Sequence, residues 1–198
     1  MSISLAKKQT ISLDKEAGTG LRKIRMGLGW DPVKPSGFFG KLLNSDTAVD
    51  LDASCIVVDN NQRPVDMVWF RQLKSNDGLI AHSGDNRTGD GNGNGDDETI
   101  SVNLEALSGN IAHLVFTVNS FLGQTFEKVG NAYCRIVDDV TGKELARFNL
   151  SDQGHHTGMI MAYLTRTASG WNVTAVGQRS NGRTVADLGN EAVAAVNA

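Results

Sequence analysis

The chain has 198 residues, of which 40% are hydrophobic and 21% are charged, and these values suit one globular domain rather than a disordered or fibrous chain. The formal net charge is −3, which excludes a broadly basic face for binding nucleic acid. No run approaches the roughly 20 apolar residues of a membrane span, and the N-terminus lacks the apolar core of a signal peptide. We therefore expect a cytoplasmic protein without membrane insertion.

Apolar residues alternate with other residues along most of the chain, which is the period of an extended strand. In IRMGLGW, for example, Ile24, Met26 and Leu28 fall on one face. Clusters of Gly, Asn, Asp and Ser separate such segments. In chain order the pattern predicts strands over residues 24–30, 50–59, 65–70, 99–104, 111–118, 132–138, 144–150, 158–166 and 171–178, with short edge strands over 3–6 and 10–14.

About nine or ten short strands with regular turns predict an all-β fold, namely a β-sandwich of two mainly antiparallel sheets that bury one face against each other. Residues 31–49 break the period, carry two of the three prolines and contain the Phe38–Phe39 pair, so they predict a long loop. A domain over residues 1–185 is then followed by an alanine-rich segment, 186–198, which predicts a short C-terminal helix or tail.

The two cysteines, Cys55 and Cys134, both lie in apolar runs. Two cysteines are too few for a disulfide scaffold, so the sequence predicts buried free thiols. Burial predicts that these thiols are chemically inert, which argues against thiol chemistry as the activity of the chain.

The stretch HSGDNRTGDGNGNGDDETI, His82 to Ile100, combines glycines with an unusual density of acids. From Asn76 to Glu98 the chain has six acidic residues and one basic residue, Arg87. Such a cluster of acids repels itself unless a cation neutralises it. Glycine permits the tight turns that bring ligands together, and carboxylate and amide oxygens are the ligands of calcium. The stretch therefore predicts a site for a hard cation, and the alternative is a mobile spacer between two strands.

An EF-hand is excluded as the form of this site. Residues 90–95 match the first six positions of the EF-hand loop, but Ser101 occupies the twelfth, where a bidentate glutamate is required. The residues that follow alternate as a strand rather than continuing as a helix. The oxygen-rich ligand chemistry of the loop is unaffected by this exclusion.

A second acidic element lies at the start of a predicted strand. Asp50 and Asp52 are two residues apart, so they point to the same face, roughly 7 Å apart along the strand. Two neighbouring carboxylates need a cation or a basic partner between them. If they share one end of the sandwich with the acidic loop, their oxygens complete one or two cation sites, to which Asp85 and Asn86 contribute.

These motifs together resemble the TerD family of tellurium-resistance proteins. The resemblance is carried by HSGDNRTG…GDDE after DLDAS and GLGWD, and by FTVNSFLGQTF, AYCRIVDD and GKELARFNL, which are most similar to its TerZ branch. It runs from about Ile3 to Asp187 and implies a cytoplasmic β-sandwich that binds calcium. It also implies a non-enzymatic role in tellurite and stress resistance. The implied partners are other tellurite-resistance proteins and the integral membrane protein TerC, which would hold the chain peripherally at the inner membrane.

The resemblance implies one or two calcium ions, with ligands among Asp50, Asp52, Asp85, Asn86, Asp90, Asn94, Asp96, Asp97 and Glu98. The usual family run is T-G-[ED]-G-D-G-D-D-E. Here TGDGNGNGDDE is two residues longer and has asparagine where aspartate is usual. Because the number of charged ligands tunes calcium affinity, the sequence predicts weaker binding than in members with the all-acid loop.

Two other classes of function stay open on the sequence alone. A metal-dependent hydrolase would use the acids and a divalent ion to activate water, but it needs a general base that the sequence does not identify. A purely structural subunit would use the glycine-rich loop only as a spacer. His82 precedes the acidic loop and is expected to pack beside it rather than to bind calcium, because imidazole suits softer metals.

Overall fold

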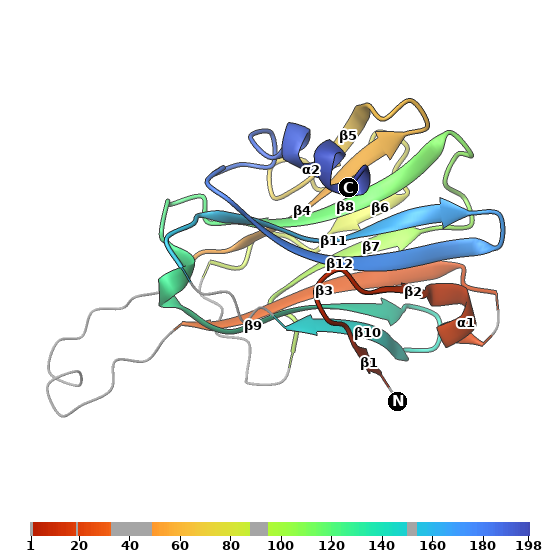
Figure 1. The fold of residues 1–198 in the computed structure, drawn as a ribbon, viewed down its shortest axis with the longest axis horizontal. Coiled ribbons are helices and arrows are strands. Elements are labelled where there is room, and N and C mark those ends of the chain that lie inside the picture. Colours follow the sequence, from red (N-terminus) through yellow and green to blue (C-terminus); the bar gives the residue numbers. More distant parts are fainter. Residues whose placement is uncertain (1, 19, 33–48, 88–94, 150–153) are drawn as a thin grey trace, which may run out of the picture.

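The structure is a computed structural model that describes residues 2–18, 20–32, 49–87, 95–149 and 154–198, and these form two stacked six-stranded sheets (Figure 1). In chain order the elements are β1 (Ile3–Ser4), β2 (Thr10–Ser12), α1 (Leu13–Ala17), β3 (Lys23–Pro32), β4 (Asp52–Asp59), β5 (Pro64–Val68), β6 (Ile80–His82), β7 (Glu98–Asn103), β8 (Ile111–Asn119), the 3-10 helix η1 (Phe126–Lys128), β9 (Val129–Asp138), β10 (Glu144–Asn149), β11 (Gly158–Thr167), β12 (Gly170–Ser180) and α2 (Gly189–Val196).

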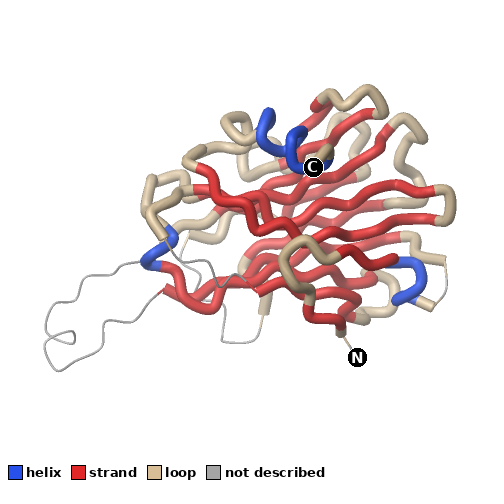
Figure 2. Tube along the Cα trace, in the orientation of Figure 1, coloured by secondary structure: helices blue, strands red, loops and turns tan. Residues whose placement is uncertain are grey.

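The first sheet has the strand order β1-β10-β9-β3-β7-β6, and the second has the order β2-β12-β11-β8-β4-β5. Among the described strands only β1 and β10 pair in parallel; the other pairs are antiparallel. Strands dominate both layers, and the helices lie at the periphery (Figure 2). The predicted all-β sandwich with a short C-terminal helix is confirmed.

The core between the sheets is built by the residues whose alternation predicted the strands. Ile24, Met26 and Leu28 of β3 are at most 1% exposed, and they belong to the same apolar cluster as Leu114 and Phe116 of β8. Burial of this kind stabilises the fold by roughly 25 cal/mol per Å² of apolar surface. The alternating pattern predicts the strands correctly because one face of each sheet is buried in the core between the sheets.

The structure has twelve strands among the described residues, more than the nine or ten expected. β6 is absent from the predicted strands because three residues are too few to show a period of two. The predicted edge strand over residues 10–14 is too long, because α1 begins at Leu13. There the Ser12 hydroxyl accepts the Lys15 N–H at 3.4 Å and caps the helix, and Gly18 ends it in the left-handed region at φ 77°. The predicted loop over 31–49 falls mainly on residues 33–48, which lie outside the described residues.

The C-terminal helix α2 covers the outer face of the second sheet (Figure 1). Leu188, next to its first turn, is fully buried against Ile56 of β4, Val115 of β8 and Ile160 of β11. The second sheet is therefore apolar on both faces where the helix lies, and the segment predicted as a helix or tail is an integral part of the fold. No helix of the described residues has the length and apolar character needed to cross a bilayer.

Both cysteines are buried and free, as predicted. Burial raises the pKa of Cys134 to about 12 and also raises the pKa of Cys55 well above its usual range. The reactive thiolate form is therefore scarce at neutral pH, and the two thiols act as small core residues.

Candidate metal centre

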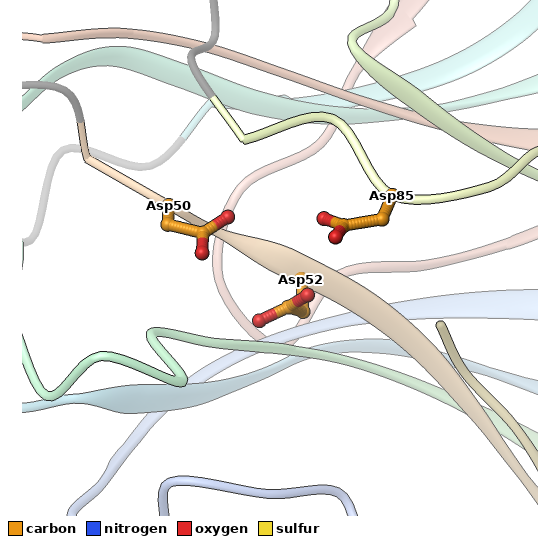
Figure 3. Close-up of side chains that lie close together, drawn as sticks. All are labelled: Asp50, Asp52 and Asp85. Atoms are coloured by element: carbon orange, nitrogen blue, oxygen red, sulfur yellow. The ribbon is translucent and has the colours of Figure 1, made fainter. Parts of the chain in front are cut away.

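Three aspartates from distant parts of the chain meet at one end of the sandwich. Asp50 lies just before β4, Asp52 is the first residue of β4, and Asp85 comes from the connection between β6 and β7. Figure 3 shows the three carboxylates around a common space. One oxygen from each lies within 4.8 Å of the others, a spacing that suits one shared cation. Because β4 belongs to the second sheet and β6 and β7 to the first, the cluster spans both layers.

Two oxygens of this cluster are buried without a hydrogen-bond partner in the described part of the chain. They are Oδ1 of Asp50, a residue 7% exposed, and Oδ2 of Asp52, a residue 4% exposed. Buried polar atoms are normally satisfied, and an unsatisfied carboxylate oxygen is costly. A cation between these oxygens would supply the missing partner.

The electrostatics of the cluster point the same way. Burial, followed by repulsion from Glu98, Asp50 and Asp85, raises the pKa of Asp52 to about 7. Burial, followed by repulsion from Asp85, also raises the pKa of Asp50, although Arg87 opposes this shift. Near neutral pH Asp52 is therefore partly protonated unless positive charge is placed among the carboxylates. A bound divalent cation would displace that proton.

The donor set fits calcium in its chemistry. All three side chains offer carboxylate oxygens, and hard cations such as Ca²⁺ take six to eight oxygen ligands. Asn86 and Asp97 lie beside the cluster: the Asn86 amide donates to the Asp97 carbonyl at 3.3 Å, and Asp97 Oδ2 accepts the Trp30 N–H at 2.9 Å. Asp90 and Asn94, which the sequence also predicted as ligands, lie outside the described residues.

Glu98 has a different environment from the three aspartates. It is fully buried, Oε2 accepts the Ala53 N–H at 2.7 Å, and Oε1 accepts the Asn86 N–H at 3.0 Å. Ala53 follows Asp52 and Asn86 follows Asp85, so one carboxylate ties together the two segments that carry the cluster. The alternation of β7 contained this signal, because Glu98 shares a face with the buried Ile100 and Val102.

His82 completes this arrangement, and sequence reasoning placed it beside the loop without assigning it a role. Its Nδ1 accepts the Gly84 N–H at 3.0 Å, which assigns the ring proton to Nε2. Nε2 then donates to the Ala53 carbonyl at 3.1 Å and lies 3.3 Å from Glu98 Oε2. The histidine therefore contacts Glu98 and helps to hold it in place.

Asp96 lies apart from the cluster, on the outer face of the first sheet. Arg135 of β9 grips it with two hydrogen bonds, Nε to Oδ1 at 2.7 Å and a terminal nitrogen to Oδ2 at 3.0 Å. This pairing raises the pKa of the Arg135 guanidinium. Asp96 rests directly on Gly27 of β3, where an added Cβ would lie 2.2 Å from the Asp96 carboxyl carbon. Its carboxylate is thus engaged in fastening the chain to β3 and β9.

Gly27→Ala is expected to destabilise the protein by about 1–3 kcal/mol, because the new methyl group must push Asp96 away from Arg135. Chemical denaturation with urea measures this change. Gly20→Ala is the matched control, since no heavy atom of the described residues lies within 4 Å of a Cβ built there. Its stability should stay within about 1 kcal/mol of the parent. Equal stability of the two variants would contradict the tight packing of Asp96 on β3.

The fold and this end of the sandwich define a class: an antiparallel two-sheet sandwich whose rim gathers acidic side chains capable of holding a metal ion. Comparison with known proteins identifies the family. The TerD domain matches residues 1–191, and the chain belongs to the TerD family.

Relatives match the chain over nearly its whole length. It is 49% identical to "Tellurium resistance protein TerZ" from Serratia marcescens, with 98% of each chain covered. It is 40% identical to "Stress response protein SCP2" from Bacillus subtilis (strain 168), covering 95% of this chain and 98% of that protein. A crystal structure of a homologue of telluride resistance protein (TerD) from Streptomyces coelicolor A3(2) superimposes with a TM-score of 0.69 at 26% identity, covering 87% of this chain and 98% of that one. The family supports a role in tellurium and stress resistance, and these names do not indicate catalysis.

Proposed function

We propose that this chain is a calcium-binding, non-enzymatic protein of a tellurite- and stress-resistance system, and that it acts through protein–protein interactions ordered by calcium. The observation that carries the proposal is that Asp50 and Asp52, which cluster with Asp85, each have a buried oxygen without a hydrogen-bond partner among the described residues. When bound, calcium supplies the positive charge that these carboxylates lack. The resistance role follows the names of the relatives.

Each part of the chain has a distinct task in this proposal. Asp50, Asp52 and Asp85 hold the ion, and Asn86, Asp97, Asp90 and Asn94 are the further ligand candidates from the acidic stretch. Glu98 positions the two segments that carry the aspartates, because its oxygens accept backbone N–H groups from both. Asp96 fastens the end of the acidic stretch to β9 through Arg135. The resistance context makes other tellurite-resistance proteins, including a TerC-type membrane protein, the proposed partners, with the chain on the cytoplasmic side.

Calcium is expected to raise the melting temperature of the purified protein, because the unfolded chain offers no preformed site. At a calcium concentration 100 times Kd the stabilisation is about 2.7 kcal/mol. For a chain of this size that corresponds to a shift of roughly 5–11 °C. Differential scanning calorimetry with millimolar calcium against a chelator measures it, and magnesium at the same concentration is the control for general ionic effects. An unchanged melting temperature together with no heat of calcium binding in titration calorimetry would contradict the proposal.

A further inference from the structure

An arginine held by three aromatic rings lies at the same end of the sandwich as the aspartates. The Arg71 guanidinium carbon is 4.9 Å from the ring centre of Phe121, 5.3 Å from that of Phe70 and 5.6 Å from that of Trp69. The rings also contact one another edge-on, at 4.9 Å between Trp69 and Phe70 and 5.4 Å between Phe70 and Phe121. Together with Leu122 these residues form what we call the Arg71 cluster.

The cluster is open to solvent, and its arginine has no anionic partner among the described residues. Arg71 is exposed, and within the described residues its guanidinium contacts rings but no carboxylate or carbonyl. Leu122, next to Phe121 in the chain, is 55% exposed and adds apolar surface. A stacked guanidinium is held in place while its N–H groups remain available, and their fork matches a carboxylate. The cluster therefore presents an oriented anion-binding group beside an exposed apolar side chain.

The loop that carries Phe121 and Leu122 is connected to both buried aspartates. The Phe121 backbone N–H interacts with the Asp52 carboxylate and opposes the rise of its pKa, and the side-chain oxygen of Gln124, in the same loop, accepts the Asp50 N–H at 3.1 Å. On the other side, Val68 pairs with Cys55, and Trp69 bridges to Gln72, so the tight turn at Phe70–Arg71 lies beyond β5, at the Asp52 end of β4. Whatever fixes the positions of Asp50 and Asp52 therefore also fixes the segment that carries Phe121 and Leu122.

We propose that the Arg71 cluster is a docking surface for an acidic segment of a partner protein that also carries a large apolar side chain, and that docking requires the cation site to be filled. This inference rests on the calcium-binding function proposed above. A carboxylate of the partner would pair with Arg71, and its apolar side chain would pack on Phe121 and Leu122. Three carboxylates close by repel an acidic segment, and a divalent cation among them neutralises most of that charge and reduces the repulsion. Calcium and the partner thus strengthen each other's binding.

A protein segment suits this surface better than an anionic membrane. Binding to an anionic leaflet gains about 1 kcal/mol per basic residue and therefore needs a cluster of several. The cluster offers Arg71, and the neighbouring Arg183 is bonded to the Phe121 carbonyl at 2.8 Å. Arginine and aromatic residues in close packing are, by contrast, the residues that dominate protein interfaces.

Phage display tests the proposal. A random peptide library is selected against the full chain in millimolar calcium. The enriched peptides should combine Asp or Glu with Leu, Phe or Trp. A fluorescent copy of the strongest peptide should bind Arg71→Ala about tenfold more weakly than the parent, as expected for loss of a hot-spot arginine. A chelator should weaken binding to the parent to a similar degree. Arg63→Ala is the matched control, because Arg63 is an exposed arginine paired with Asp59 at the opposite end of β4, and its affinity should equal that of the parent.

The outcomes separate the two proposals. If calorimetry shows calcium binding, three results would overturn the docking surface and leave the calcium site in place. They are enriched peptides that lack acids, no enriched peptide at all, and equal binding to the parent and to Arg71→Ala. The docking surface would likewise be overturned if calcium bound but the chelator left peptide affinity unchanged. No heat of calcium binding would instead remove the proposed function. Sedimentation with vesicles of phosphatidylglycerol and phosphatidylcholine is expected to leave the protein in the supernatant; calcium-dependent pelleting lost in Arg71→Ala would show that the surface serves a membrane.

Discussion

Asp52→Asn is expected to abolish the calcium-dependent rise in melting temperature and to leave the calcium-free protein at least as stable as the parent at pH 7.5. The substitution removes a ligand and a buried negative charge in one step, while the shape of the side chain is kept. Loss of a charged ligand from a cluster of three should weaken calcium binding by well over tenfold. Titration calorimetry and thermal unfolding, each with and without calcium, measure the two effects.

The same substitution should change how stability depends on pH. The pKa of Asp52 is about 7 in the folded protein and near its ordinary value of 3.8 in the unfolded chain, so the folded state holds the proton more tightly between these values. Stability of the calcium-free protein therefore falls as pH rises from about 4 to about 7. A difference of about three in pKa sets an upper bound of about 4 kcal/mol, and partial access of solvent reduces this to about 1–2 kcal/mol. Asp52→Asn should flatten that fall in a series of urea unfolding curves.

Asp59→Asn provides a control on the same strand. Asp59 lies at the far end of β4, where its carboxylate accepts the Arg63 and Asn61 N–H groups at 2.9 Å, and these bonds lower its pKa. Its replacement should reduce stability at neutral pH and leave the calcium response intact. Calcium stabilisation retained in Asp52→Asn, or lost in Asp59→Asn, would contradict the assignment of Asp52 as a ligand.

Glu98→Ala is expected to destabilise the protein by about 3–5 kcal/mol, the second of the two largest effects. It leaves the buried Ala53 N–H and the part-buried Asn86 N–H without their acceptor, and the buried His82 Nε2 without its carboxylate. It also releases the Asp85 segment from β4, so calcium affinity should fall even though no proposed ligand has been removed. Urea unfolding gives the stability, and calorimetry gives the affinity.

Glu105→Ala is the matched control for that substitution, because Glu105 is exposed and its removal should change stability by no more than about 0.5 kcal/mol. A Glu98→Ala variant that is as stable as Glu105→Ala would show that the buried carboxylate is not a tether. A variant that is destabilised but binds calcium with unchanged affinity would show that the tether supports the fold and not the site.

The architecture was predictable because the physical cause of a strand is local. Alternation in Ile24, Met26 and Leu28 reports a sheet with one dry face, and the structure buries those residues together. The short strand β6 was not predicted, because its formation depends on a partner strand elsewhere in the chain. β6 exists because Ile80 and His82 pair with Val102 and Ile100 of β7, and three residues carry no period that reveals this.

The candidate site was predictable in its chemistry and less so in the roles of its members. Spacing alone placed Asp50 and Asp52 on one face, and their meeting with Asp85 matches the expectation that the loop and the strand share an end of the sandwich. The acids from 96 to 98 look equivalent in sequence, yet Asp96 faces outward to Arg135 and Glu98 faces inward to Ala53. Such roles depend on a partner far away in the chain, and only the inward position of Glu98 could be read from β7.

The acidic stretch is held by a side-chain contact at each of its two ends. On one side Asn86 is held by Glu98, and on the other Asp96 is held by Arg135. Lengthening the chain between two fixed points changes closure entropy only slightly. Insertions between residues 87 and 95 therefore need not move Asp50, Asp52 or Asp85. If the chain binds calcium as proposed, changes in the length and charge of this stretch can alter the affinity without displacing the aspartate cluster.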